Sequence, residues 1–275
     1  MEIQFPEIID TDHPERYIFT LKVELDLFSF SLYDPVVDNS YFYYEIPVER
    51  DSDAFSSFKR FFFENPFLTS SFRKIYILNG YPEFTFVPEL LYKEDEAKSF
   101  VEFNFIDSTG KILSQKLRYP EIVIIHKLSE EIYRFLNRSF VDARFIHRIS
   151  SIITYYQSKV KEINASQLII NLRNKQLDII CFSRGSFVFG NCFEINQLQD
   201  AVYYVLFTWK QLRLDQIKDY VYVSGDKYEK VKLMKEIVSY IHNIIPVNFP
   251  ATAHFREVDI QNIPVEFACL TLCEL

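Results

Sequence analysis

The feature that most constrains the fold of this chain is a series of secondary-structure patterns that occurs twice. The first copy predicts strands over 21–25, 28–33 and 40–48, a helix over 54–64 and a strand that ends at Gly80. The second copy predicts strands over 168–172, 176–183 and 186–193, a helix over 197–212 and a strand over 220–225. Leu25 and Gly80 are 55 positions apart, and Leu172 and Gly225 are 53 apart. The sequence therefore predicts an α/β protein that contains a duplicated β-β-β-α-β unit.

The chain is long enough for two such units, because its 275 residues exceed a typical domain of about 100–150 residues. We expect an N-terminal half over 1–148 and a C-terminal half over 149–275. The remaining patterns predict strands over 84–88, 112–117, 121–126 and 246–249, and helices over 93–105, 129–137, 148–161 and 226–244. The segment 265–274 is compatible with either a helix or a strand.

Residue spacing supports these assignments. Leu21, Val23 and Leu25 alternate with a period of two, as in a half-buried strand. Asn196, followed three residues later by Gln199, indicates the start of a capped helix, and Asp226 with Glu229 indicates another.

Charge and composition exclude several classes of function. The formal net charge of −8 argues against nucleic-acid binding, which needs a basic surface. We find no basic start followed by an apolar run, and no apolar stretch near the ~20 residues that cross a bilayer. We therefore expect a cytoplasmic protein with no membrane insertion and with reduced cysteines. The four cysteines and five histidines lack metal-site spacing, so no metal is expected.

Glycine is scarce and aromatic residues are abundant. The chain has 5 glycines, whereas average usage would give about 19, and the backbone of a phosphate-binding loop needs glycine to approach the anion. No P-loop occurs. The 28 phenylalanines and 18 tyrosines fit ordinary core filling or a partner-binding surface. Candidates for that surface are Tyr41, Tyr43, Phe61, Tyr203 and Phe207.

The duplicated unit resembles the actin-like ATPase fold, which is built from two ribonuclease-H-like halves with mixed sheets. Residues 168–225, read as a hairpin, a third strand, a long helix and a strand ending in Ser224-Gly225, are most similar to the type IV pilus assembly and cell-division branch of that superfamily. The whole chain is also similar to an uncharacterised bacterial domain-of-unknown-function family with this fold. The resemblance implies two lobes and a nucleotide site between them.

The motifs that the resemblance implies are degraded. Active members carry an Asp-x-Gly turn in each first hairpin, but here the first turn is Asp26-Leu27-Phe28 and the second is Arg173-Asn174-Lys175. Active members usually show Gly-Gly after the later strand, where this chain has Ser224-Gly225 followed by Asp226. Bulky tips and a carboxylate at a helix start disfavour phosphate binding, so the resemblance implies the fold but argues against ATPase activity.

We therefore expect a non-catalytic bilobal scaffold or adaptor, a pseudo-ATPase that needs no cofactor and contacts an unknown protein partner or a second copy of itself. The alternative is an ATP-binding switch or weak ATPase. It would bind Mg-ATP in a rearranged cleft at Asp26, Arg173, Lys175, Ser224 and Gly225. Each of these residues also has a plain structural reading, as a turn residue, an exposed turn cation or a helix cap.

Overall fold

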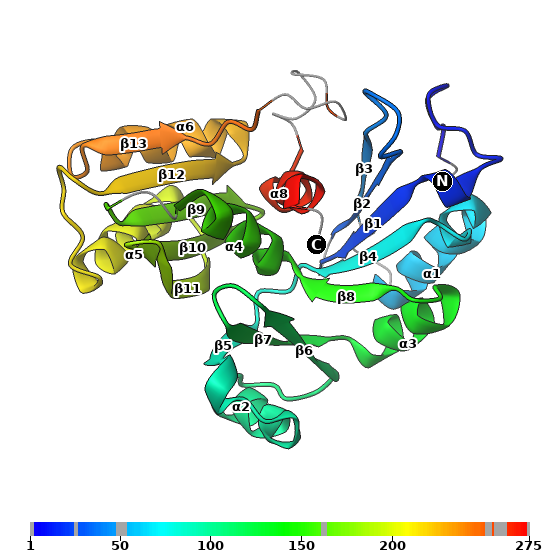
Figure 1. Ribbon diagram of the computed structural model, residues 1–275, viewed down its shortest axis with the longest axis horizontal. Helices are drawn as coiled ribbons and strands as arrows, with labels where there is room; N and C mark the ends of the chain where they lie inside the picture. The colour runs from blue at the N-terminus through cyan, green and yellow to red at the C-terminus, as the bar shows by residue number, and fades with distance from the viewer. Residues whose placement is uncertain are drawn as a thin grey trace.

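The computed structural model describes residues 3–24, 27–47, 54–160, 164–250, 255 and 263–273. It contains two five-stranded mixed sheets and one three-stranded antiparallel sheet. Figure 1 shows the sheet of the first half on the right, that of the second half on the left, and helix α8 between them.

The first sheet has the strand order β3-β2-β1-β4-β8. Its strands are β1 (Ile18–Val23), β2 (Leu27–Tyr33), β3 (Phe42–Pro47), β4 (Lys74–Asn79) and β8 (Arg144–His147). Helices α1 (Ala54–Glu64) and α3 (Glu130–Ser139) cover one face. Alternate residues Phe19, Leu21 and Val23 of β1 lie in the same core as Phe58 and the other buried side chains of these helices, which is why the strand pattern has a period of two.

The second sheet repeats this arrangement with the order β11-β10-β9-β12-β13. Its strands are β9 (Gln167–Arg173), β10 (Gln176–Ser183), β11 (Ser186–Glu194), β12 (Tyr220–Gly225) and β13 (Asn243–Pro246). The accompanying helices are α5 (Leu198–Gln211) and α6 (Lys227–Ile237). In both sheets the first two strands are antiparallel, and the first strand pairs in parallel with the strand after the helix. The duplication and the α/β fold predicted from the sequence are thus confirmed.

Between β4 and β8 the first half carries an additional subdomain. It consists of β5 (Phe84–Pro88), α2 (Ala97–Asn104), β6 (Lys111–Leu117) and β7 (Ile122–Leu128), with sheet order β5-β7-β6. Short 3₁₀ helices span Pro14–Arg16, Pro66–Thr69, Glu89–Leu91 and Glu94–Glu96.

Two helices cross between the halves. Helix α4 (Arg148–Lys159) begins where we expect the C-terminal half to start, and its Ile152 and Ile153 pack with Ile180 of the second sheet. Helix α8 (Val265–Cys273) comes from the end of the chain, yet its Phe267 packs with Leu78 of the first sheet. The inner faces of both sheets are therefore covered by α4 and α8, which also pack against each other.

Three local predictions need correction. The helix expected over 226–244 ends at Ile237, and 243–246 forms β13 because parallel pairing of Tyr220 with Asn243 extends the sheet. The cap of α5 is Gln197, one residue later than expected, and its reciprocal partner is Asp200. The strand expected over 246–249 is also wrong, because β13 ends at Pro246 and the described residues 247–250 lie outside any strand. The segment 265–273, for which the sequence was compatible with a helix or a strand, is helical.

Candidate functional site

The tip of the second hairpin is a tight two-residue turn. Arg173 pairs with Gln176 across β9 and β10, and the intervening Asn174 and Lys175 have φ angles of 49° and 58°. Two consecutive left-handed residues define the turn type that matches the twist of a hairpin, and asparagine tolerates that conformation well. The turn therefore forms without glycine, and the side chain of Lys175 occupies the tip.

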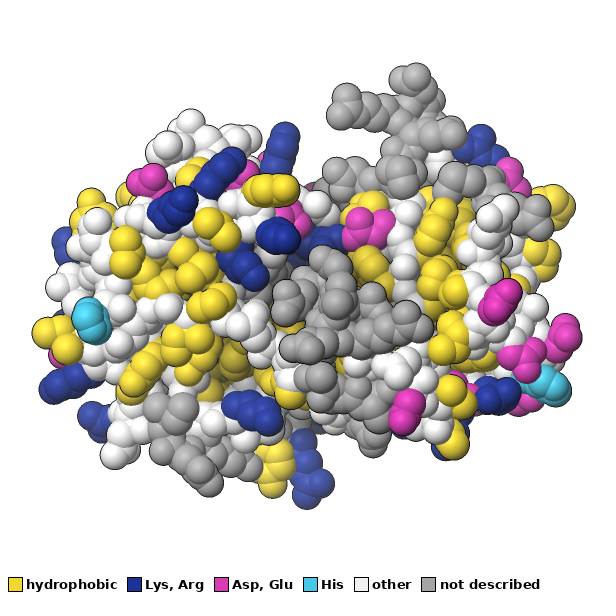
Figure 2. All heavy atoms as spheres, turned by 90° about the horizontal axis from the view of Figure 1, so that it is seen from above, with side chains coloured by type: hydrophobic (Ala, Val, Ile, Leu, Met, Phe, Trp, Pro, Cys, Tyr) yellow, Lys and Arg dark blue, Asp and Glu magenta, His cyan; other side chains and the backbone are white. Residues whose placement is uncertain are grey.

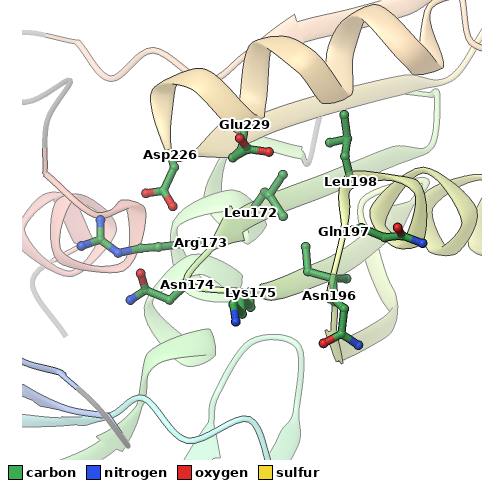
Figure 3. Close-up of a pocket in the computed structure, with 10 residues that line it drawn as sticks. Leu172, Arg173, Asn174, Lys175, Asn196, Gln197, Leu198, Asp226 and Glu229 are labelled. Carbon is green, nitrogen blue, oxygen red and sulfur yellow. The ribbon is translucent and has the colours of Figure 1, made fainter. Parts of the chain in front are cut away.

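The guanidinium of Arg173 reaches across to the first half. It forms an ion pair with Glu45 on β3 and lies 3.4 Å from the hydroxyl of Tyr43. Burial raises the pKa of Tyr43, and the Glu45 carboxylate adds to this effect while Arg173 opposes it. In Figure 3 Arg173 points toward α8, whereas Lys175 points in another direction. The side chains of Arg173 and Lys175, which the alternative function would bring together at a nucleotide, therefore point in different directions.

Ser224 and Gly225 end β12 beside β9. The hydroxyl of Ser224 donates to the carbonyl oxygen of Ile170 at 2.8 Å. Gly225 has a φ of +115°, and a Cβ built there would lie 1.9 Å from the carbonyl oxygen of Leu172. The close approach of two strands, rather than of a ligand, therefore requires glycine at this position.

Asp226 takes the N-cap position of α6, but its side chain makes no capping hydrogen bond. The expectation that this carboxylate satisfies the free N–H groups of the helix is therefore wrong. Its backbone N–H donates instead to the carbonyl oxygen of Leu172 at 2.9 Å, which ties the start of α6 to β9.

These residues line two cavities. Arg173, Ser224 and Gly225 border a cavity of about 360 Å³ together with Lys227 and Lys230. Burial and the charge of Lys227 lower the pKa of Lys230. Figure 2 looks onto this side of the molecule and shows lysine and arginine side chains gathered near the boundary between the halves.

A second cavity of about 210 Å³ lies beside it. Arg173 and Lys175 line it, together with the carboxylates of Asp226 and Glu229 (Figure 3). Asp26, the remaining predicted site residue, lies outside the described residues.

A buried charge cluster lies where the first hairpin meets α8. Lys22 on β1 is 2% exposed and contacts the carboxylates of Glu24, at 2.8 Å, and Glu266 on α8. Burial by itself raises the pKa of Glu266, but attraction to Lys22, Arg173 and Arg148 outweighs it and lowers the pKa to about 2. Glu266 is therefore an ionised side chain that forms an ion pair with Lys22, and the positive charges of Arg173 and Arg148 stabilise it further.

A second buried cluster joins α4 to the second sheet. Arg148 is 2% exposed and forms a two-point ion pair with Asp178 on β10, with one N–O distance of 2.7 Å. It also donates to the side-chain oxygen of Gln176 at 3.0 Å and to the carbonyl oxygen of Gly80 at 3.2 Å. Arg148 thus links the two halves, because Asp178 and Gln176 lie on β10 of the second sheet and Gly80 follows β4 of the first sheet.

Sequence reasoning missed these buried charges. The signal that could have found them is a single charged residue flanked by apolar ones, as in Leu21-Lys22-Val23, Leu177-Asp178-Ile179 and Val265-Glu266-Phe267. A charge within an apolar strand or helix is buried together with its neighbours and needs a partner.

Two buried histidines lie close together, and the cysteines carry free thiols. His126 and His147 are buried with ring centroids 5.2 Å apart, and burial lowers the pKa of His126 to about 3. Within the described residues there is no group of three or more potential metal ligands. The four thiols are free, and burial raises the pKa of Cys181 to about 12.

The aromatic candidates for a partner surface differ in exposure. Phe61 is in the core at 5% exposed, so it is not a surface residue. Tyr41 and Tyr43 are half-buried and contact Phe255 and Phe267. Tyr203 and Phe207 on α5 are 59% and 45% exposed and stack on each other, with ring centroids 5.7 Å apart.

The fold defines the class of protein. A protein from Bacteroides thetaiotaomicron, described as having an actin-like ATPase fold and unknown function, is 28% identical to this chain, with a TM-score of 0.84. The match covers 96% of this chain and 99% of the other. The PilM-PilN type IV pilus biogenesis complex contains a chain that is 12% identical with a TM-score of 0.61, over 94% of this chain and 98% of that one. The protein therefore has the actin-like ATPase fold.

The family follows from the sequence. Residues 6–244 match the model of a family described as "Protein of unknown function (DUF3822)", and the chain belongs to that family. No curated protein shows significant similarity to it. Among the helices of the described residues, none has the length and apolar character needed to span a membrane.

Proposed function

We propose that this protein is a non-catalytic bilobal scaffold or adaptor whose nucleotide site is degenerate. The observation that carries the proposal is that two buried or half-buried cations of the hairpin strands, Arg173 and Lys22, already have carboxylate partners from the same chain. Arg173 binds Glu45, and Lys22 binds Glu24 and Glu266. An incoming phosphate would have to compete with these internal anions.

The turn geometry supports the same proposal. Phosphate loops expose backbone N–H groups to the anion, which requires small residues at the tip. Here the second tip is Asn174-Lys175, and Gly225 is needed for contact with Leu172. Neither the Asn174-Lys175 turn nor Gly225 therefore forms a loop suited to binding a triphosphate.

A scaffold needs a contact surface, and we place it on α5. Tyr203 and Phe207 are large, exposed and stacked, and such rings contribute strongly when an interface buries them. The partner is another protein or a second copy of the chain.

One observation favours the alternative, an ATP-binding switch. The cavity of about 360 Å³ next to Ser224 has three cations on its described border, Arg173, Lys227 and Lys230, against the single carboxylate of Asp226, and this excess of positive charge suits an anion. The two functions predict different nucleotide binding by the wild type and by a variant in which Arg173 is released from Glu45.

The test is a titration with a fluorescent ATP analogue and Mg²⁺, followed by anisotropy. The scaffold proposal expects no saturable binding at millimolar nucleotide in the wild type. Glu45→Gln frees Arg173 from its carboxylate, so weak binding by this variant alone would fit a degenerate site. Saturable wild-type binding that Arg173→Gln and Lys230→Gln weaken at least tenfold would instead establish the switch.

A further inference from the structure

A groove far from the hairpins separates two open sheet edges. Strand β8 ends the first sheet and β6 ends the three-stranded sheet, so each has one side without a neighbouring strand among the described residues. The two edges approach each other where the backbone N–H of His147 donates to the side-chain oxygen of Gln115 at 3.0 Å. Figure 1 shows β6 and β8 on neighbouring parts of the first half, with α4 beside them. Open edges offer unpaired backbone donors and acceptors to an extended chain.

Two cavities hollow this part of the molecule. A cavity of about 420 Å³ lies between β6, β8 and α4, and a second cavity of about 430 Å³ lies at the starts of β4 and β8. Arg144 borders both cavities. Leu117 and Ile146, which are buried, contribute apolar surface to the first cavity.

The groove is basic although the chain is acidic. Lys116, Arg118 and Arg144 border the first cavity, and its described lining contains no Asp or Glu. Arg73 and Lys74 border the second, where Asp142 is the acidic residue of the lining. Lys116 also contacts Glu89 at 3.4 Å, a partly exposed pair that contributes little. For a chain of net charge −8 this is a local reversal of sign, which attracts an acidic partner.

One buried polar atom in the lining of the first cavity points to a ligand with a hydrogen-bond donor. Gln157 on α4 is 8% exposed and its side-chain nitrogen donates to the carbonyl oxygen of Gly185 at 2.7 Å. The side-chain oxygen of Gln157 is buried and has no partner among the described residues. A buried acceptor without a donor is costly, and a backbone N–H of a bound segment would satisfy it.

We propose that this groove binds an extended, acidic segment of another protein, which adds a strand to β6 or β8. The open edges would pair with its backbone, Leu117 and Ile146 would contact its apolar side chains, and Lys116, Arg118 and Arg144 would bind its carboxylates. A nucleic acid would match the charge but not the strand edge. The proposal goes beyond the scaffold function and does not depend on the state of the hairpins.

The test begins with a display library of random dodecapeptides selected on the purified full chain. We expect the enriched peptides to carry at least two acidic residues that alternate with apolar ones. A synthetic fluorescent copy of the most enriched peptide is then titrated by anisotropy against three proteins. They are the wild type, the groove variant Lys116→Gln/Arg118→Gln/Arg144→Gln and the control variant Lys98→Gln/Lys232→Gln/Lys235→Gln.

The control changes the net charge by the same amount as the groove variant, but away from the groove. We expect binding to weaken at least tenfold in the groove variant and to change less than twofold in the control, with all three proteins melting at similar temperatures. A proline in the middle of the peptide should also weaken binding at least tenfold, because proline cannot donate to a strand.

Hydrogen exchange supplies a readout of location. Bound peptide should protect backbone amides within 111–119 or 144–147. The proposal is overturned if no peptide is enriched, if the enriched peptides lack acidic residues, or if the groove variant binds as well as the wild type. Equal competition by a single-stranded oligonucleotide would also overturn it, since that would indicate a general polyanion surface.

Discussion

Replacement of Arg148 by methionine tests whether the buried ion pair between α4 and β10 holds the two halves in register. Methionine keeps much of the length of the side chain but removes its charge. Asp178, 1% exposed, would then lose its ion-pair partner and keep the hydrogen bond from Asn171 at 3.1 Å. Loss of one partner of a buried pair costs about 3–5 kcal/mol, because the other charge stays desolvated. For a chain of this size we expect the melting temperature to fall by roughly 6–10 °C.

The assay is urea denaturation of the wild type, Arg148→Met, Asp178→Leu and the double variant. We expect the double variant to be at least about 2 kcal/mol more stable than the two single losses added together, because it leaves no unpaired charge. Arg134→Met is the matched control. Arg134 pairs with Glu130 on the exposed side of α3 at 2.9 Å, and its loss should cost no more than about 0.5 kcal/mol. Additive losses in the cycle, or a loss below about 1 kcal/mol for Arg148→Met, would refute the reasoning.

Three further predictions concern other parts of the structure. Gly225→Ala should lower the free energy of unfolding by about 2 kcal/mol or more, measured by urea denaturation, because alanine is strained at its positive φ and meets a backbone oxygen; an unchanged midpoint would contradict this. The pKa of Glu266 is about 2 in the folded protein against an ordinary value of 4.5, so its contribution to stability is complete above pH 4.5 and is lost as the pH falls toward 2. Denaturation midpoints from pH 6 to 2.5 should therefore fall more steeply in the wild type than in Glu266→Gln, and parallel curves would refute the assignment. Finally, Tyr203→Ser and Phe207→Ser should each change stability by no more than about 0.5 kcal/mol, whereas Phe61→Ser should cost at least about 3 kcal/mol; only the two exposed positions are then suitable for testing partner contact in pull-down experiments.

The strands and most helices could be predicted because their signals are local. β10 and α1 have the bounds that the alternation and the phenylalanine spacing indicate. The end of α6 could not be predicted, because apolar residues continue at helical spacing as far as Ile244 while the chain there pairs with β12. The helix ends where it does because the following residues pair with β12, and the local sequence does not reveal that pairing.

The candidate site was harder to predict than the fold. The ends of β9 and β12 meet, as parallel neighbours must, so Arg173 and Ser224 were expected near each other and border one cavity. The direction of Arg173 depends on Glu45, which is 128 positions away in the chain. No local pattern reveals that pairing. The same holds for Lys22 and Glu266, which are 244 positions apart.

The central proposal is that the fold has been retained without nucleotide binding, and thermal melting in the presence of Mg-ATP or Mg-ADP tests it most directly. A ligand that binds only the folded state stabilises it by about 2.7 kcal/mol at a hundredfold excess over its dissociation constant. That amount would raise the melting temperature by roughly 5 °C for a chain of this size. We expect no shift at millimolar nucleotide. A dose-dependent rise of several degrees would contradict the scaffold account and establish a nucleotide-dependent protein.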